Sequence, residues 1–214
     1  MGLDFYPEGP HFSYGGFTYF RNCIGHHFNI PLTLHEYKYQ FGNETRHGSY
    51  LVTNTTIKEH DSEYSFLEKF LLHSDCDGYL TPEECEGISI LMDEYISQLE
   101  KDIKKMKSNY HKLFKTKKDY VFYLKKYGLP AMQWRSNSWD EHLTNNVHKT
   151  ILQVLYSNNI NQIYKNCKKY FNVSNVIVSA EHQLQQAKEF NNTLKTCVEW
   201  ACNLEQRKRS KSII

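Results

Sequence analysis

The chain has 214 residues, a length that suits one domain, or one domain with a helical extension. Hydrophobic residues make up 40% of it, which is enough for a packed core, and its net charge is only +2. It contains no run of 18 apolar residues and no recognisable signal peptide. We therefore expect a cytoplasmic protein with reduced thiols, no disulfide framework and no contact with a membrane.

The charges are distributed unevenly along the chain. Between Glu59 and Glu100 there are twelve acidic residues and one basic residue. Between Lys101 and Lys126 there are ten lysines and two acidic residues. Such blocks indicate either mutual contact or two separate faces for partners.

The N-terminal third predicts mixed structure. A short strand is expected at residues 4–5, and a short helix at 17–28, where apolar residues recur at spacings of three and four. Aromatic residues alternate with polar residues at 37–41, and residues 50–55 (YLVTNT) are rich in strand-forming residues. The two segments predict the strands of a hairpin with a long polar loop between them. Residues 64–72 predict a short helix or strand that leads into an acidic loop.

From Pro82 onward the sequence predicts helices. Apolar residues keep helical spacing over residues 88–113, which predicts one long helix. A further helix is expected at 119–127, because glycine and proline follow it closely.

Three more helices and a brief strand complete the prediction. A capping pattern at 138–141 starts a helix that runs to Leu155, and a shorter helix is expected at 160–171. The β-branched residues that follow predict a connection with a brief strand at 176–178. A long terminal helix is expected at 180–207.

These elements predict a predominantly helical α+β fold, in which a small N-terminal mixed region with a β-hairpin precedes long antiparallel helices. Helices this long leave surface for dimerisation, so a homo-oligomer is a further expectation.

The acidic segment at 73–84 has the layout of a calcium-binding EF-hand loop, with a histidine where the pattern wants an oxygen ligand. The predicted ligands of a divalent cation, calcium or magnesium, are His73, Asp75, Asp77, Tyr79 through its carbonyl, Thr81 through water, and Glu84. A softer metal would use the histidine and the two aspartates instead.

Two other interpretations use the same segment. Thr81 and Glu84 form a capping box with a proline between them, and the preceding aspartates then make Asx turns. The D-x-D-G sequence at 75–78 also resembles the strand end of haloacid-dehalogenase-type phosphatases, in which the first aspartate is the nucleophile. That family needs alternating strands and helices downstream, where this sequence predicts mostly helices.

Residues typical of binding surfaces lie in the second half of the chain. Trp134 and Arg135 sit on a predicted loop and Trp139 lies beside it, and such side chains are typical binding anchors. Lys117 and Lys118 belong to the lysine block, where aromatic residues alternate with lysines. That pattern is found in nucleic-acid faces, but a solvated helix face explains it more simply, so nucleic acid is the less favoured partner.

Residues 1–5 (MGLDF), 12–21 (FSYGGFTYFR) and 73–85 (HSDCDG followed by TPEEC) resemble a group of small uncharacterised proteins of bacteria and bacteriophages. The resemblance covers about half of the chain and includes a stretch like residues 190–201. Residues 104–179 look like an insertion relative to that group, so the resemblance implies a core α+β domain of residues 1–103 and 180–214 and a helical insertion lobe of residues 104–179. It implies a phage or bacterial origin and a cytosolic setting, and it implies no activity.

We therefore expect a protein without catalytic activity: a phage or mobile-element accessory protein that binds a host protein in the host cytoplasm and inhibits an antiviral defence system. Three alternatives stay open. They are a calcium-like metal-binding module, a sponge for a nucleotide signal, and a metal-dependent phosphatase or nuclease. The sequence contains no Gly-rich phosphate loop and no G-x-S-x-G motif.

Overall fold

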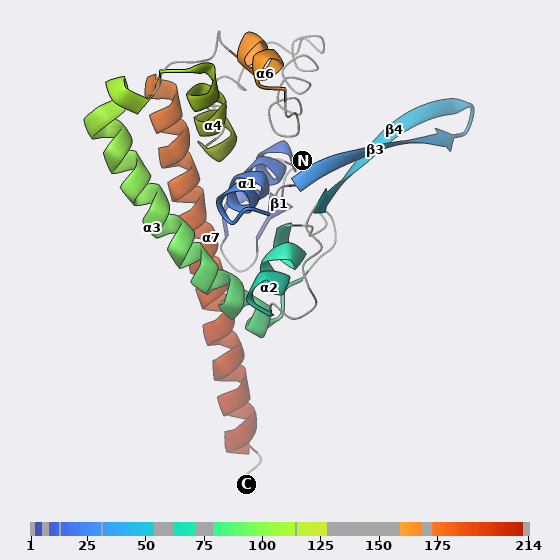
Figure 1. The fold of residues 1–214 in the computed structure, drawn as a ribbon. Coiled ribbons are helices and arrows are strands. Elements are labelled where there is room, and N and C mark those ends of the chain that lie inside the picture. Colours follow the sequence, from blue (N-terminus) through green and yellow to red (C-terminus); the bar gives the residue numbers. More distant parts are fainter. Residues whose placement is uncertain are drawn as a thin grey trace.

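A computed structural model describes residues 3–5, 9–12, 14–30, 32–53, 62–71, 79–113, 115–127, 159–167 and 173–211. The elements in chain order are β1 (Leu3–Asp4), β2 (His11–Phe12), α1 (Tyr14–His27), β3 (Leu32–Phe41), β4 (Glu44–Thr53), α2 (Ser62–Leu71), α3 (Pro82–Leu113), α4 (Lys117–Tyr127), α6 (Ile160–Cys167) and α7 (Val173–Lys211). The predominantly helical α+β fold is confirmed (Figure 1).

The long helices α3 and α7 lie antiparallel and form the centre of the fold, as predicted (Figure 1). Three exposed ion pairs mark their register: Asp93–Lys195 at 2.9 Å, Glu100–Lys188 at 2.6 Å and Lys107–Glu181 at 2.6 Å. The acidic half of α3 is thus matched by lysines of α7, and its basic half by a glutamate. Exposed pairs contribute little stability, but the reverse orientation would place like charges together.

A buried polar contact also fixes the register of these two helices. Ser89 Oγ donates a hydrogen bond to Asn191 Oδ1 at 2.6 Å, and Asn191 Nδ2 donates to Asp93 Oδ1 at 2.7 Å. A buried amide left without partners costs about 1–3 kcal/mol. Sliding α7 by one turn along α3 would therefore be penalised.

The apolar core forms where α1 and α2 pack on the α3–α7 pair. The ring of Phe190 stacks on Phe70 of α2 at a centroid distance of 4.9 Å and meets Phe20 of α1 edge-on at 5.8 Å. Gly87 of α3 lies against Phe66 of α2, whose ring would be 2.7 Å from an added Cβ. This close approach accounts for a glycine inside a helix, where it otherwise costs about 1 kcal/mol relative to alanine.

The hairpin of β3 and β4 is longer than predicted, and its loop is shorter. Phe41 pairs directly with Glu44, so the turn consists of Gly42 and Asn43 alone, and the pairing continues back to Leu32 opposite Thr53. Gly42 has φ +60°, which a two-residue hairpin turn with glycine in first place requires. The long polar loop predicted after Phe41 was wrong, because its residues continue as strand β4.

The start of α7 corrects a second prediction. Residues 176–178, predicted as a brief strand, lie in the first turns of α7, which begins at Val173 and not at Ala180. Val176 and Ala180 are one turn apart and are both buried. The cost of β-branched residues in a helix is only a few tenths of a kcal/mol, and burying this apolar face outweighs it.

The division into a core domain and an insertion lobe stays a prediction. In the described residues, Tyr127 of α4 belongs to the same apolar core as α1, α3 and α7. α6 contacts α4, where the rings of Tyr164 and Tyr120 lie 5.8 Å apart. The helix predicted from 138 to 155 lies outside the residues that the structure describes.

Candidate partner-binding face

The start of α4 is fixed by a local capping pattern. Thr116 N donates to Asp119 Oδ2 at 2.7 Å, and Asp119 N donates to Thr116 Oγ1 at 3.2 Å. Hydrogen bonds from Thr116 hold the pKa of the Asp119 carboxyl below its usual range. These bonds satisfy backbone groups that the first helical turn leaves free.

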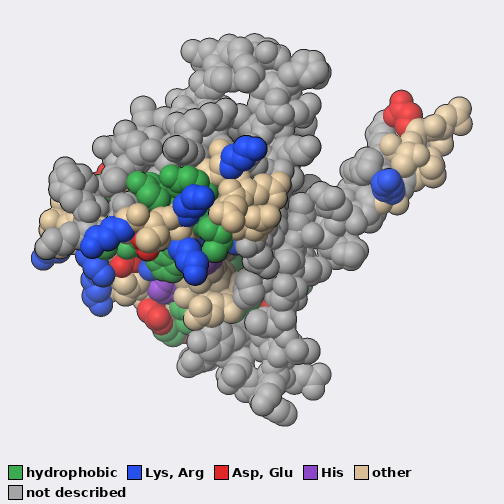
Figure 2. Space-filling view, turned by 45° about the horizontal axis from the view of Figure 1, so that its top comes forward, with side chains coloured by type: hydrophobic (Ala, Val, Ile, Leu, Met, Phe, Trp, Pro, Cys, Tyr) green, Lys and Arg blue, Asp and Glu red, His purple; other side chains and the backbone are tan. Residues whose placement is uncertain are grey.

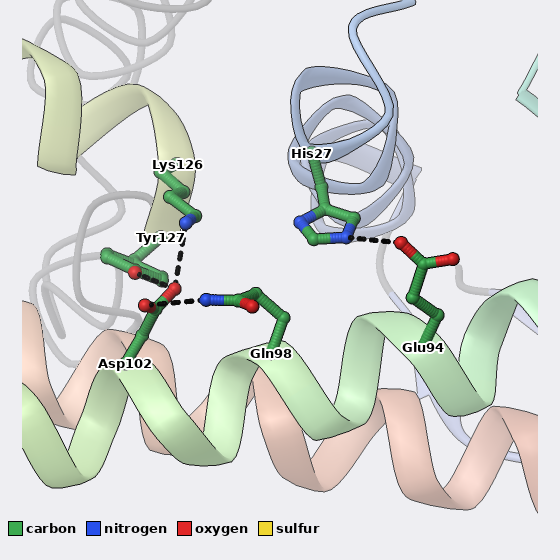
Figure 3. A network of polar contacts seen from close by, with 6 residues as sticks. All are labelled: His27, Glu94, Gln98, Asp102, Lys126 and Tyr127. Atoms are coloured by element: carbon green, nitrogen blue, oxygen red, sulfur yellow. Dashed lines mark hydrogen bonds and ion pairs between the residues drawn. The ribbon is translucent and has the colours of Figure 1, made fainter.

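The other end of α4 is tied to α3 by the carboxylate of Asp102 (Figure 3). Its Oδ2 accepts a hydrogen bond from Lys126 Nζ at 2.7 Å and one from the Tyr127 hydroxyl at 2.6 Å, and its Oδ1 accepts one from Gln98 Nε2 at 2.9 Å. The side chains of Asp102 and Lys126 are only 17% and 16% exposed. Charge-assisted hydrogen bonds are stronger than neutral ones, so this cluster sets the spacing of the two helices.

Opposing effects determine the charge of the Asp102 cluster. Burial raises the pKa of Asp102, but the hydrogen bonds from Lys126 and Tyr127 outweigh burial and hold that pKa below its usual value. Burial and the bond to the carboxylate raise the pKa of Tyr127 far above its usual value. At neutral pH the carboxylate is therefore charged, and the phenol keeps its proton and donates it.

Two histidines at the end of α1 lie beside this cluster. His27 Nε2 is 3.9 Å from Glu94 Oε1 (Figure 3), and the His27 ring is 5.2 Å from the ring of Tyr95. Burial, followed by the charge of Lys126, lowers the pKa of His27, and burial lowers the pKa of His26. Both imidazoles are therefore neutral at neutral pH, and the contact with Glu94 is not an ion pair there.

On its outer side, α4 presents basic and aromatic side chains to solvent. Phe122 is 50% exposed. Lys118, which is exposed, stands four residues before it, and Lys125, which is half-buried, stands three residues after it, so all three lie on one side of the helix. Figure 2 shows lysine side chains, with hydrophobic side chains between them, over α4 and the end of α3. We call Lys118, Phe122 and Lys125 the α4 face.

The α4 face continues into its neighbours. The ring of His26 lies 6.2 Å from that of Phe122, and Lys126 Nζ lies 5.9 Å from the centre of the same ring. A half-exposed ring on a lysine-rich helix suits an acidic surface that offers an apolar pocket. The charges then favour encounter, and burial of the ring contributes affinity.

The predicted partner-binding residues divide into two groups. Trp134, Arg135 and Trp139 lie outside the described residues, so their role stays a prediction. Lys117 and Lys118 are exposed at the start of α4. Lys117 Nζ lies 5.6 Å from the centre of the Tyr164 ring of α6.

The capping box predicted at the end of the acidic segment is confirmed. Glu84 N donates to Thr81 Oγ1 at 3.2 Å, and Thr81 N donates to Glu84 Oε2 at 2.8 Å. The other oxygen, Oε1, accepts a hydrogen bond from Lys69 Nζ of α2 at 2.5 Å. The bond from Lys69, followed by that from Thr81, lowers the pKa of Glu84. Both carboxylate oxygens of Glu84 therefore already have protein partners.

The other predicted metal ligands are not brought together in the described residues. Tyr79 is 81% exposed. His73, Asp75 and Asp77 lie outside the residues that the structure describes. Within the described residues, no three side chains of His, Cys, Asp or Glu are grouped so that they could hold a metal ion. Metal binding by the acidic segment stays a prediction.

None of the helices in the described part of the chain is long and apolar enough to cross a membrane.

Sequence reasoning missed Asp102 and Tyr127 as the residues that position the α4 face. A signal was present, because Asp102 and Asp119 are the two acidic residues inside the lysine block. Each of them fixes one end of α4. An isolated carboxylate in a basic segment is expected to pair locally, but only the fold shows that Asp102 pairs with residues 24 and 25 positions further along the chain.

Comparisons with protein-family models, with curated proteins and with solved structures find no match for this chain.

Proposed function

We propose that this protein is a non-catalytic binding protein, and that it captures an acidic partner protein on the α4 face. The observation that carries the proposal is the half-exposed ring of Phe122, which lies on one side of α4 with Lys118 and Lys125. Phenylalanine is among the aromatic residues that are enriched in protein–protein interfaces.

Contacts at both ends of α4 hold this face in place, which favours binding without rearrangement. A capping box fixes the start of α4, and the Asp102 cluster fixes its end. A face held in place before binding loses less conformational entropy when a partner docks. Lys126 is engaged by Asp102, and Lys118 is exposed on the same side of α4 as the ring. Lys125 is half-buried, and burial lowers its pKa.

We further propose that the partner is a host protein and that the protein acts in the host cytoplasm, where it inhibits an antiviral defence. The resemblance to small bacterial and phage proteins supports this part of the proposal. Trp134, Arg135 and Trp139 would then extend the contact beyond the α4 face.

The test is capture of the partner by tagged protein from a nuclease-treated bacterial lysate, followed by size-exclusion chromatography and titration of the isolated partner. We expect Phe122→Ala to weaken binding about tenfold or more, which corresponds to about 1.4 kcal/mol. Lys118→Glu should slow association and reduce its dependence on salt. Ile90→Ala is the matched control, because Ile90 is 66% exposed on the first half of α3.

Several outcomes would contradict the proposal. A complex that disappears on nuclease treatment would point to nucleic acid as the partner. Loss of binding in Leu204→Ala but not in Phe122→Ala would move the site to the end of α7, which extends past the other helices (Figure 1) and where Leu204 is 57% exposed. The absence of any complex that survives chromatography would reject partner capture.

A further inference from the structure

Two free cysteine thiols meet between α3 and α7, away from the α4 face. Cys85 lies in the first turn of α3 and is 3% exposed, and Cys197 of α7 packs, partly buried, against the same apolar core. The two side chains lie close enough for each to affect the pKa of the other. Neither is in a disulfide. The thiols are 112 residues apart in the chain, so the contact is made by the fold and not by local sequence.

The surrounding contacts hold this pair in place. One turn beyond Cys85, Ser89 is bonded to Asn191 of α7, and Asp93 is bonded to Lys195. A disulfide needs two side chains that point toward each other across a short backbone distance. Cys85 lies one turn before Ser89, and Cys197 lies between one and two turns after Asn191, so the antiparallel register brings both thiols to the same stretch of the α3–α7 contact.

We propose that Cys85 and Cys197 form a redox-responsive disulfide site, which a disulfide oxidant such as oxidised glutathione converts into a covalent link between α3 and α7. The Cys197 thiolate attacks one sulfur of the oxidant, forms a mixed disulfide and releases one glutathione. The Cys85 sulfur then loses its proton and attacks the Cys197 sulfur, which releases the second glutathione. Two thiols are oxidised and one glutathione disulfide is reduced to two thiols, so atoms and electrons balance.

The burial of the two sulfurs determines the order and the pace of the reaction. Cys197 is the more accessible thiol, so it meets the oxidant first. Burial raises the pKa of Cys85 to about 12, and burial raises the pKa of Cys197 as well, although the side chain of Cys85 partly offsets this. Because the thiolate is the reacting form, the link should form slowly at neutral pH and faster as the pH rises.

A disulfide at Cys85 would affect the start of α3 and the acidic segment before it. Cys85 directly follows Glu84, whose carboxylate holds the capping box at Thr81 and contacts Lys69 of α2. A covalent link at Cys85 would hold the start of α3, and with it the end of the acidic segment, on α7. This inference is independent of the proposed function, since it involves no residue of the α4 face.

The test is incubation of the purified full chain with oxidised glutathione at pH 8.5, followed by intact mass measurement and peptide mapping. We expect a monomer that has lost two hydrogens, a linked peptide pair containing Cys85 and Cys197, and two fewer of the six thiols on titration in denaturant. The melting temperature should rise and should return to its initial value after reduction. Cys197→Ser and Cys85→Ala should abolish the link, whereas Cys202→Ser, at an exposed position of the same helix, should retain it.

Other products would overturn the proposal. A lasting glutathione adduct on Cys197 would show that Cys85 cannot reach it. A link from Cys197 to Cys76 that persists in Cys85→Ala, or a dimer joined through Cys202, would place the reactive pair elsewhere. Unchanged mass and thiol count at pH 8.5 would show that the pair does not respond to a disulfide oxidant.

Discussion

The hydroxyl of Tyr127 donates a hydrogen bond of 2.6 Å to the carboxylate of Asp102, and this contact joins the last turn of α4 to the middle of α3. Tyr127 is 1% exposed, and Lys126 shares the same carboxylate oxygen. The lysine-rich segment thus keeps one carboxylate inside the fold. The position of the α4 face depends on this contact.

Replacing Tyr127 by phenylalanine should therefore destabilise the protein. The change removes a donor from a largely buried carboxylate and leaves the ring in place, so we expect a loss of about 1.5–3 kcal/mol in the free energy of unfolding. Urea unfolding followed by circular dichroism would measure it. A loss below about 0.5 kcal/mol would show that the contact does not hold α4 in solution.

The matched variant Tyr95→Phe should behave differently. Tyr95 is fully buried on the same side of α3, and its hydroxyl has no hydrogen-bond partner among the described residues. A buried polar group without a partner carries an unfavourable desolvation cost. We therefore expect the free energy of unfolding to stay unchanged or to rise by about 1 kcal/mol, in the same urea experiment. A loss as large as that of Tyr127→Phe would indicate that an ordered water binds the Tyr95 hydroxyl.

Mild acid should destabilise the protein through His27. Because burial lowers its folded-state pKa below the usual 6.5, the unfolded chain binds a proton between these two values and the folded chain does not. The stability contributed by the neutral imidazole is therefore complete above pH 6.5 and declines as the pH falls toward the folded-state pKa. One such group contributes at most about 1.4 kcal/mol per pH unit.

Melting curves between pH 7.5 and pH 5.5 would test this effect. The variant His27→Gln should have a smaller loss of melting temperature over this range than the wild type. Equal losses in wild type and His27→Gln would assign the acid response to other groups. Asp102 would add to the loss only at lower pH, since its folded-state pKa lies below that of the unfolded chain.

The long helices could be predicted from the sequence because apolar spacing and capping residues, which are local signals, determine them. The apolar spacing from Ile88 onward predicted α3, and Thr81 with Glu84 predicted the capping box at its start, both of which the structure confirms. Antiparallel packing of α3 and α7 followed from the lengths of their apolar stripes. In each case the residues that carry the signal lie within a few turns of one another.

The predictions failed where distant contacts decide the outcome. The β-branched run 176–178 indicates a strand in isolation, but burial of Val176 makes it helical. The cluster around Asp102 and the thiol pair of Cys85 and Cys197 join residues that are far apart in the chain. Such contacts exist only after α3, α4 and α7 have packed, so local periodicity and capping signals do not contain them.

The two capping boxes offer a direct comparison of local stability. Thr81→Ala and Thr116→Ala each remove a side-chain acceptor at the start of a helix, and each should cost about 1 kcal/mol in the free energy of unfolding. Serine at either position should restore most of the loss, because it supplies the same acceptor. Urea unfolding of the four variants would measure this. If alanine at Thr81 cost nothing, the box would not stabilise the start of α3.

The carboxylate of Glu84 distinguishes between a helix cap and a calcium site at the start of α3. Both oxygens of Glu84 are engaged, by Thr81 N and by Lys69 Nζ, so a bidentate calcium ligand would first have to give up these partners. We therefore expect calcium, magnesium and EDTA to leave the melting temperature of the wild type unchanged, and Asp77→Ala to respond in the same way. A ligand that binds only the folded state must raise the melting temperature. A calcium-specific rise that disappears in Asp77→Ala and grows in Lys69→Ala would instead show that the acidic segment binds the ion, and that the lysine competes with calcium for Glu84.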